Sequence, residues 1–326
     1  METRDQIPFW LRTANGIAFS EIPQREGGQL PHFAIVGAAK AGTTALNRYL
    51  SQHPQIYMCP LKEPHFFSSD LMYERGLEWY KGLYADAEPG QICGEASTSY
   101  TFWPISSKTA RRLYETLPHF KIIYILREPV ARVEAECLQM LKYSRYVLGD
   151  TSLPYSVDEL LRYLRSEDNS TGLNPIETSE YIRHVEEYLK FFQREQLLVI
   201  FQKDLQDSTD KVMARIKEFL GLDPQVRVET GNHLNVTADF IRGVESEKFA
   251  ETAKKVPGYQ LTKGLLPKPV KEKIKSFLIG RRQDDDAVVF MSPETRRELT
   301  AHFKPYNDRL ADFLDHPLSD WKSYDD

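Results

Sequence analysis

The segment Phe33–Leu50 has the sequence FAIVGAAKAGTTALNRYL, and it contains the pattern that decides the fold. Apolar residues lead to two glycines, Gly37 and Gly42, with four residues between them, and a helix-forming stretch follows. A strand, a glycine-marked loop and a helix in this order supply backbone N–H groups and a helix N-terminus, which together suit a phosphate. The segment therefore predicts a phosphate-binding loop between a buried strand and a helix.

The position of the loop lysine argues against a triphosphate ligand. In the ATP-binding pattern G-x-x-x-x-G-K-[ST] the lysine directly follows the second glycine and reaches the β- and γ-phosphates. Here Thr43 and Thr44 follow Gly42, and the only lysine of the loop is Lys40. ATP hydrolysis and phosphoryl transfer are therefore disfavoured, and Lys40 is placed for a single 5′-phosphate and the group attached to it. The glycine spacing alone also fits a junction chosen only for backbone geometry.

Outward from this segment, short apolar strands alternate with helices. Strands are expected at 33–36, 54–58, 91–95, 121–127 and 196–202. Helices are expected at 43–51, 76–84, 105–117, from Pro129 onward, and at 178–193, 208–221 and 292–314. This alternation predicts an α/β fold, a three-layer sandwich like that of the P-loop NTPases, with a central parallel sheet flanked by helices.

The sequence pattern also predicts the domain organisation. Residues 1–30 are expected to form an N-terminal extension, and residues 31–326 a single domain. Within that domain residues 225–292 are irregular and rich in charge. We expect them to form a mobile cover over the nucleotide and acceptor sites.

Composition sets further limits. The net charge of −5 argues against nucleic acid or a highly sulfated glycan as the main partner. Cys59, Cys93 and Cys137 are too scattered for a disulfide framework or a zinc site, so we expect buried thiols in a reducing compartment. The N-terminus has no signal-peptide core, and no run of about 18 apolar residues would span a membrane. We expect a cytoplasmic protein, and the sequence carries no signature of an oligomeric state.

Five segments, in order, resemble the PAPS-dependent sulfotransferases, in particular the branch shared by bacterial enzymes and the Golgi heparan-sulfate sulfotransferases. LKEPHFF (61–67) is similar to the K-E-x-H-F-F element of that branch, and GEASTSY (94–100) to its G-E-x-[ST]-P-x-Y segment. LKEPHFF ends the first segment, which runs from the loop region over residues 31–67, and the remaining three segments are 122–133, 198–222 and 306–321. The resemblance implies transfer of a sulfuryl group from 3′-phosphoadenosine 5′-phosphosulfate (PAPS) to an acceptor hydroxyl, without a metal ion.

The resemblance also implies a donor site. The 5′-phosphosulfate would be held by the loop residues Lys40, Ala41, Gly42, Thr43 and Thr44. Lys40 would stabilise the charge that grows on the bridging oxygen, and Lys62 would be a second cation at the sulfonate. Their structural alternatives are an exposed loop lysine and a surface ion pair with Glu63.

The resemblance assigns proton removal and 3′-phosphate binding to other side chains. Glu95, at the end of a predicted strand, is the candidate general base, and His65 is the alternative base. Arg127 would bind the 3′-phosphate with a bidentate guanidinium, while Arg132 would support the following helix. A capping or salt-bridged glutamate and a structural arginine are the ordinary alternatives.

At one position the chain departs from the family pattern R-x-P-x-x-R-x-x-S. Ala135 stands in the 3′-phosphate site where relatives have a serine, between Glu134 and Glu136. Loss of a hydroxyl donor to a charged group costs about 1.5–3 kcal/mol. Another donor compensates (Tyr143 and Ser144 are candidates), or donor affinity is weak, or the activity has drifted.

The acceptor has no residue-level signature. A carbohydrate hydroxyl, or a hydroxylated acyl chain or other natural product, free or carrier-bound, ranks ahead of a phenol. The alternative function is a catalytically weak or inactive nucleotide-binding regulator, which Ala135 leaves open. Lys40, Lys62 and Glu95 together favour an enzyme, because binding alone needs no base at the sulfonate.

Overall fold

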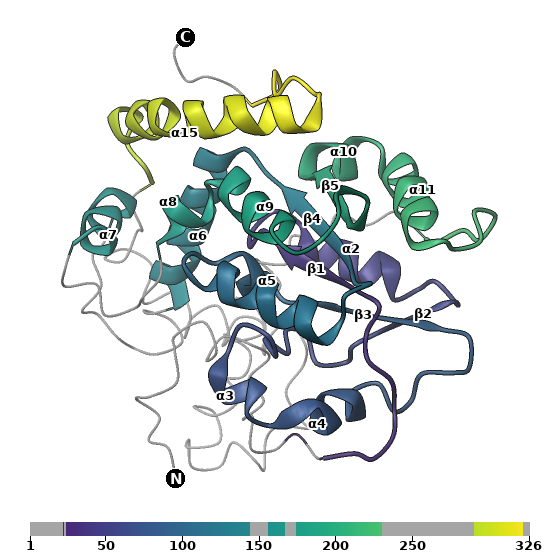
Figure 1. The fold of residues 1–326 in the computed structure, drawn as a ribbon. Coiled ribbons are helices and arrows are strands. Elements are labelled where there is room, and N and C mark those ends of the chain that lie inside the picture. Colours follow the sequence, from purple (N-terminus) through teal and green to yellow (C-terminus); the bar gives the residue numbers. More distant parts are fainter. Residues whose placement is uncertain (1–21, 23, 144–155, 167–173, 230–289, 322–326) are drawn as a thin grey trace, which may run out of the picture. The chain divides into compact units, whose positions relative to one another are not determined.

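The computed structural model describes residues 22, 24–143, 156–166, 174–229 and 290–321. Within these ranges the chain forms a five-stranded, all-parallel sheet with helices on both faces (Figure 1). Across the sheet the strands are β2 (Ile56–Met58), β3 (Ile92–Ala96), β1 (Phe33–Gly37), β4 (Lys121–Leu126) and β5 (Leu197–Phe201). The predicted layered α/β architecture is confirmed, and each strand lies close to its expected range.

The helices of the described ranges connect and cover these strands. They are α2 (Thr43–Leu50), α3 (Asp70–Tyr73), α4 (Gly76–Gly82), η3 (Thr98–Thr101), α5 (Ile105–Thr116), α6 (Pro129–Tyr143), α7 (Val157–Leu164), α8 (Pro175–Thr178), α9 (Tyr181–Leu189), η5 (Arg194–Gln196), α10 (Gln202–Asp207), α11 (Thr209–Leu220) and α15 (Pro293–Leu314). The bounds of α11 confirm the expected signals, since Ser208 precedes the helix and Gly221 ends it with a φ of 76°. Gly221 adopts this left-handed conformation without the steric cost of a Cβ.

One expected helix is wrong in extent. The helix predicted over 178–193 is shorter at both ends: α9 spans Tyr181–Leu189, and Thr178 is the last residue of the preceding helix α8. Between them, Ser179 Oγ donates to the carbonyl of Pro175 at 2.7 Å and accepts from Arg132 Nε at 2.6 Å. Because Arg132 is far away in the sequence, apolar periodicity could not show this interruption.

The central strands are buried on both faces. All five residues of β1 are buried, and β4 is buried from Ile122 to Leu126. In the parallel register Ile35 lies opposite Ile123 on one side, and Ala34 lies opposite Glu95 on the other. Continuous apolar runs of this kind are typical of parallel strands covered by helices on both sides.

The strand order determines where a ligand fits. From β1 the chain crosses toward β2, whereas from β4 it crosses toward β5. Right-handed crossovers then place α2 on the opposite face from α5 and α9 (Figure 1). The connections after β1 and β4 therefore diverge, and open α/β sheets bind ligands at the carboxyl ends of such strands. The predicted phosphate loop and Arg127 follow these two strands.

The chain divides into two compact units. The first consists of Met1–Glu136, Leu164–His233 and Pro293–Asp326 and contains the whole sheet. The second consists of Cys137–Tyr163 and Leu234–Ser292, and in it the backbone N–H of Ser292 donates to Asp158 at 3.1 Å. Most of the cover expected at 225–292 lies outside the described residues, as do Ser144 and the Tyr143 side chain.

Candidate active site

The loop after β1 has the conformation that its glycines allow. Gly37 has a φ of 153°, and a Cβ there would collide with Oγ1 of Thr101. Gly42 has a φ of 101° and directly precedes α2. Lys40 is a half-buried residue with a φ of 66°, a left-handed conformation that is uncommon outside glycine. The backbone is therefore folded back on itself between two positions that only glycine occupies easily.

The N-terminus of α2 suits an anion. It has no side-chain cap and no acidic residue in its first turn, and its first residues are Thr43 and Thr44. The unpaired N–H groups of a helix N-terminus, together with the macrodipole, attract negative charge. The N-terminus of α6 differs, because Glu128 accepts from the N–H groups of Val130 and Ala131 at 2.9 and 2.6 Å. Of these two helices, α2 is therefore the one whose end has no competing carboxylate.

A buried arginine supports the loop from behind. The Arg132 side chain is completely buried and donates to Ser179 Oγ, to the carbonyl of Pro175 at 2.6 Å and to the carbonyl of Ala39 at 3.3 Å. Burial alone would lower its pKa, but the carboxylate of Glu136, 2.6 Å away, contributes to a pKa above the ordinary value. Arg132 thus ties the loop after β1 to α6 and α8, a wider role than support of its own helix.

Arg127 holds the adjacent loop carbonyl. Its guanidinium donates to the carbonyl of Lys40 at 3.2 Å, and its own carbonyl accepts from the hydroxyl of Tyr181 at 2.7 Å. Burial lowers the pKa of Arg127 from its ordinary value. The structure therefore brings together two expected donor-site residues, Lys40 and Arg127, at the carboxyl ends of β1 and β4.

The two glutamates beside Ala135 are both ion-paired. Glu136 pairs with Arg132, and Glu134 pairs with Arg296 in the first turns of α15. Ala135 itself is half-buried on α6. The carboxylates that the sequence places next to a predicted phosphate site are therefore balanced by guanidinium groups.

Glu95 lies on β3 with its carboxylate in the core. Its side chain is completely buried and accepts hydrogen bonds from Ser97 Oγ at 2.6 Å, from Tyr100 at 2.7 Å and from Tyr80. Burial raises its pKa, and the three hydroxyl donors act in the opposite direction. The hydroxyls thus occupy much of the capacity of this carboxylate to accept hydrogen bonds.

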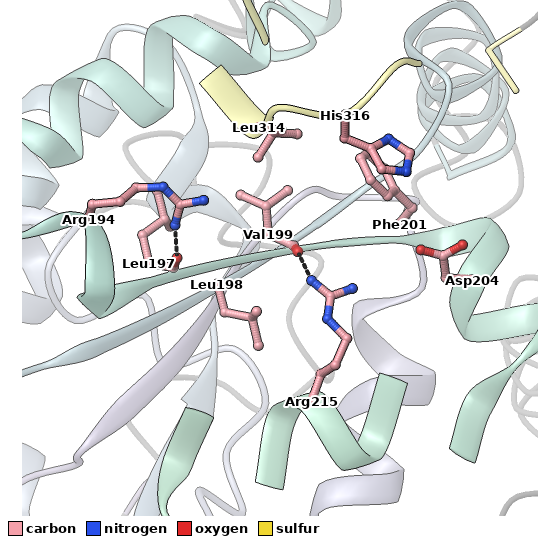
Figure 2. A pocket seen from close by; sticks show the side chains of 9 residues that line it. All are labelled: Arg194, Leu197, Leu198, Val199, Phe201, Asp204, Arg215, Leu314 and His316. Carbon is pink, nitrogen blue, oxygen red and sulfur yellow. Dashed lines mark hydrogen bonds between the residues drawn. The ribbon is translucent and has the colours of Figure 1, made fainter. Parts of the chain in front are cut away.

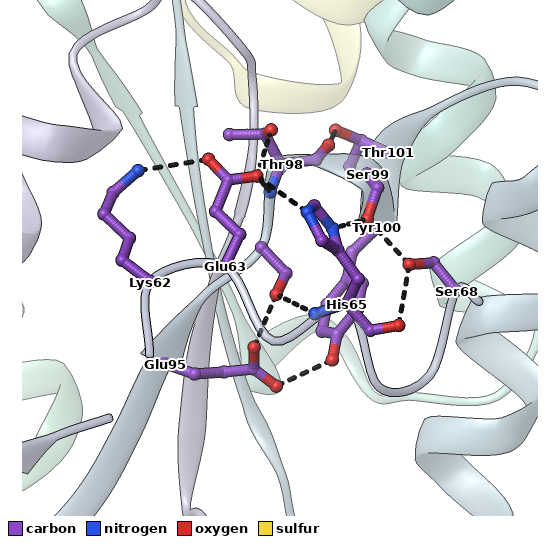
Figure 3. A network of polar contacts seen from close by, with 10 residues as sticks. Lys62, Glu63, His65, Ser68, Glu95, Thr98, Ser99, Tyr100 and Thr101 are labelled. Atoms are coloured by element: carbon purple, nitrogen blue, oxygen red, sulfur yellow. Dashed lines mark hydrogen bonds and ion pairs between the residues drawn. The ribbon is translucent and has the colours of Figure 1, made fainter. Parts of the chain in front are cut away.

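The hydroxyls around Glu95 also fix the segment 62–68 (Figure 3). Ser97 Oγ accepts from the N–H of His65 at 3.1 Å, and the Tyr100 hydroxyl accepts from the N–H of Phe67 at 3.3 Å. His65 Nδ1 lies 2.6 Å from Ser99 Oγ. We name Ser97, Ser99, Tyr100 and Glu95, with Tyr80, the hydroxyl network. Through it Glu95 is linked to the backbone that carries Lys62 and His65.

His65 is buried at 3% exposure, and burial lowers its pKa to about 4. It is therefore neutral near pH 7. Its ring is 2.6 Å from Ser99 Oγ, and its Nε2 lies 3.7 Å from Glu63. The sequence suggested His65 as an alternative base. In the structure its ring is buried and has polar neighbours, Ser99 and Glu63.

Glu63 is a site residue that the sequence analysis did not select. It accepts from Lys62 Nζ at 3.0 Å and from Thr98 Oγ1 and N–H at 2.7 and 3.1 Å (Figure 3). Burial would raise its pKa, but Lys62, His65 and Thr98 together lower it to about 2. Its side chain is 18% exposed, in contrast to Glu95. Its position between Lys62 and His65 in LKEPHFF is the feature of the sequence that could have suggested it as a site residue.

Three aromatic residues that follow β3 separate into two groups. Tyr100 and Phe102 are buried, and Tyr100 belongs to the hydroxyl network. Trp103 is half-buried, and the guanidinium of Arg183 lies 3.7 Å from its ring centroid. Of these three side chains, only Trp103 is partly exposed.

A shallow cavity lies elsewhere, along the edge strand β5 (Figure 2). Its volume is about 160 Å³, and its polar groups include Arg194 and Arg215. These donate to the outward carbonyls of Leu197 at 2.8 Å and Val199 at 3.3 Å. The arginines thus protect an open sheet edge from pairing with another strand, and none of the expected site residues lines this cavity.

The described ranges contain neither a metal-binding group of side chains nor a helix that could span a membrane. There, no three side chains of His, Cys, Asp or Glu are grouped so as to hold a metal ion. None of the helices in the described part of the chain has the length and apolar character needed to cross a membrane.

Comparison with known proteins identifies the family. The sulfotransferase domain model matches residues 30–278. The chain belongs to the sulfotransferase family. It is 30% identical over 236 residues to heparan sulfate glucosamine 3-O-sulfotransferase 6 of Mus musculus, covering 70% of this chain and 62% of the relative. It is 29% identical over 212 residues to heparan sulfate glucosamine 3-O-sulfotransferase 5 of Homo sapiens, covering 65% and 59%.

A solved structure supports the same assignment. The crystal structure of a sulfotransferase from Alicyclobacillus acidocaldarius matches with a TM-score of 0.63 and 26% identity, covering 90% of this chain and 99% of the other. The chain spans about six tenths of the length of the curated relatives. The expected family and fold are therefore confirmed.

Proposed function

We propose that this sulfotransferase moves a sulfuryl group from PAPS to a hydroxyl of a carbohydrate. The observation that carries the proposal is the N-terminus of α2, which has no carboxylate cap and follows a loop with two positive-φ positions around Lys40. Thr43 and Thr44 add hydroxyls in the first turn of that helix. These residues fit a 5′-phosphosulfate, with Arg127 at the adjacent strand end for the 3′-phosphate.

The chemistry is an in-line exchange of one S–O bond for another. The bond between sulfur and the bridging oxygen breaks, and its electron pair stays on the departing phosphate. A new S–O bond forms to the acceptor oxygen, whose proton passes to a base. Lys40 stabilises the charge on the departing oxygen, and Lys62 is a second cation at the sulfonate. Both side chains work by positioning and by charge.

Two carboxylates compete for the role of base. Glu95 was the expectation from the sequence, but it is completely buried and already accepts three hydroxyl groups. Glu63 is partly exposed and adjoins Lys62, so an acceptor hydroxyl reaches it more easily. Its lowered pKa keeps it ionised but makes it a weak base, unless Lys62 turns toward the sulfonate. On accessibility we favour Glu63, with Glu95 as a positioning residue and His65 as a structural histidine.

A carbohydrate acceptor is favoured by the relatives, whose names specify a hydroxyl of heparan sulfate glucosamine. The net charge of −5 does not favour a highly sulfated chain, so an uncharged or weakly charged sugar fits better. A hydroxylated acyl chain or other natural product is the next candidate.

The second candidate function is a nucleotide-binding regulator without turnover. Ala135 is the observation that favours it, because α6 offers no hydroxyl at that position. Transfer of labelled sulfonate from PAPS to a panel of sugars and other alcohols, without added metal, separates the two functions. Transfer supports the enzyme, whereas donor binding without transfer to any acceptor supports the regulator.

The choice of base is tested in the same assay. Glu63→Gln is expected to lower turnover by about 10²–10⁴-fold. It is also expected to lower stability at pH 7, because the lowered pKa of Glu63 means that its ionised form stabilises the fold. Glu95→Gln is expected to lower both turnover and stability, because it disturbs the hydroxyl network. If Glu95→Gln abolished turnover with normal stability while Glu63→Gln kept its rate, the base would be Glu95.

A further inference from the structure

Charged side chains lie near Ala135, the position at which α6 offers no hydroxyl to the proposed 3′-phosphate. Arg296, in the first turns of α15, is ion-paired with Glu134 of α6. The two side chains are only 22% and 14% exposed, so the pair is largely enclosed. The adjacent Arg297 is exposed. The chain thus places one arginine of a consecutive pair against α6 and the other toward solvent.

The same cluster reaches Arg127. Burial raises the pKa of Glu128, and the N–H groups of Ala131 and Val130, followed by the charges of Arg127 and Arg296, act in the opposite direction. The charge of Glu134 acts on Arg127 in turn. We name Arg127, Glu128, Glu134 and Arg296 the charged cluster. It contains two guanidiniums and two carboxylates, from the segment after β4, from α6 and from α15, and its closest contact is the ion pair between Arg296 and Glu134.

A phosphate at this position needs a donor that α6 does not supply. The first N–H groups of α6 are capped by Glu128, and position 135 is an alanine. A guanidinium carries five N–H donors in a fixed plane and can serve a carboxylate and a phosphate together. Among the residues that the structure describes, Arg296 is a cation from a different element that contacts α6, through Glu134.

We propose that Arg296 is a second binding residue for the 3′-phosphate of the donor nucleotide, supplying from α15 the contact that α6 lacks at Ala135. The inference rests on the proposed use of PAPS. Glu134 holds the guanidinium of Arg296 beside α6 and so positions it before the nucleotide binds. The site then pairs a phosphate dianion with two arginines, Arg127 and Arg296, in place of an arginine and a hydroxyl.

The test compares adenosine 3′,5′-bisphosphate with adenosine 5′-phosphate, which differ only in the 3′-phosphate. Calorimetry is run on the wild-type chain, on Arg296→Gln, and on Arg297→Gln as the matched control. Arg296→Gln is expected to weaken the bisphosphate by about 10- to 100-fold, the usual range for one charge-assisted contact, and to leave the monophosphate unchanged. Arg297→Gln is expected to bind both nucleotides as the wild type does.

Three outcomes decide the inference. If the wild type prefers the bisphosphate and Arg296→Gln keeps the same preference, the proposed role of Arg296 is wrong. The proposed use of PAPS is then unaffected. A wild type without any preference overturns the PAPS site, and with it both proposals. Unchanged monophosphate affinity shows that Arg296→Gln is folded, and regained preference in Arg296→Gln/Ala135→Ser supports the exchange of one donor for the other.

Discussion

The two sides of the β1 loop are built from different interactions. On the β3 side one buried carboxylate, Glu95, gathers neutral hydroxyls, and these hold the backbone of the segment 62–68. On the α6 side guanidiniums are paired with carboxylates: Arg296 with Glu134 in the charged cluster, and Arg132 with Glu136. The β3 side is therefore held by hydrogen bonds from neutral hydroxyls, whereas the α6 side is held by pairs of opposite charges.

The difference separates two tasks. A hydroxyl network fixes geometry, because each donor fits one acceptor at one distance and a misplaced atom is costly. An ion-paired cluster can exchange one anion for another, since a phosphate replaces or joins a carboxylate beside the same arginine. We infer that the β3 side positions the reacting groups and the α6 side binds the nucleotide.

The largest effect is expected at Arg132. Arg132→Met leaves the buried Glu136 without its cation and removes the donor to the Ala39 carbonyl. Breaking a buried pair in this way costs about 3–5 kcal/mol of unfolding free energy. Urea denaturation measures the loss, and Arg132→Met/Glu136→Leu should recover part of it. A loss below about 1 kcal/mol would mean that the ion pair does not hold the loop.

At Lys40, between the two sides, the expected effect is on rate. Lys40→Asn removes the charge and keeps a residue that tolerates a positive φ. Loss of one group that stabilises developing charge lowers turnover by about 10²–10³-fold. Sulfonate transfer is measured beside the affinity for adenosine 3′,5′-bisphosphate. If affinity fell as much as turnover, Lys40 would only bind the ground state.

The parts of this design that lie within one short segment were predictable from the sequence. The β1 loop, the end of β4 and the extent of α11 up to Gly221 each depend on neighbours in the chain, and the structure has them where expected. The apolar runs of β1 and β4 also sufficed to predict a parallel sheet covered on both faces.

What escaped prediction depends on distant partners. Glu95 ends a strand, which suggested a base, but its burial follows from Tyr80 and Tyr100 folding over it. Glu63 gains its place from Thr98, and the break between α8 and α9 from Arg132. None of these contacts leaves a periodic signal in the sequence.

A pH experiment sharpens the β3 side. The pKa of His65 is lowered to about 4 in the folded chain, against about 6.5 when unfolded. The unfolded state takes up the proton first, so stability is complete above pH 6.5 and falls as the pH drops to 4, by about 3 kcal/mol. His184, with a pKa lowered to about 3, acts in the same direction.

His65→Asn suits this measurement, because His65 has a φ of 53° and asparagine tolerates that conformation. Urea denaturation at pH 7 and pH 5 should give a smaller loss for the variant than for the wild type. Glu63 contributes little in this window, since its pKa of about 2 makes its share of stability disappear mainly below pH 4.5. An equal loss in both proteins would show that His65 is not the titrating group.

The smallest effect is expected at single hydroxyls, and it tests whether the hydroxyl network positions the segment 62–68. Tyr100→Phe removes the group that donates to Glu95 and accepts from the N–H of Phe67. Tyr84→Phe is the matched control, because its hydroxyl is equally buried but donates to Tyr80 at 3.5 Å.

Each hydroxyl contributes about 1–3 kcal/mol, so equilibrium stability alone does not separate the two variants. Amide hydrogen exchange separates them, because it reports on the backbone of one segment. Tyr100→Phe should speed exchange at Phe67 and its neighbours and lower turnover without changing nucleotide affinity, whereas Tyr84→Phe should leave that segment protected. Equal exchange in the two variants would mean that packing holds the segment, and that Glu95 is buried there without positioning anything.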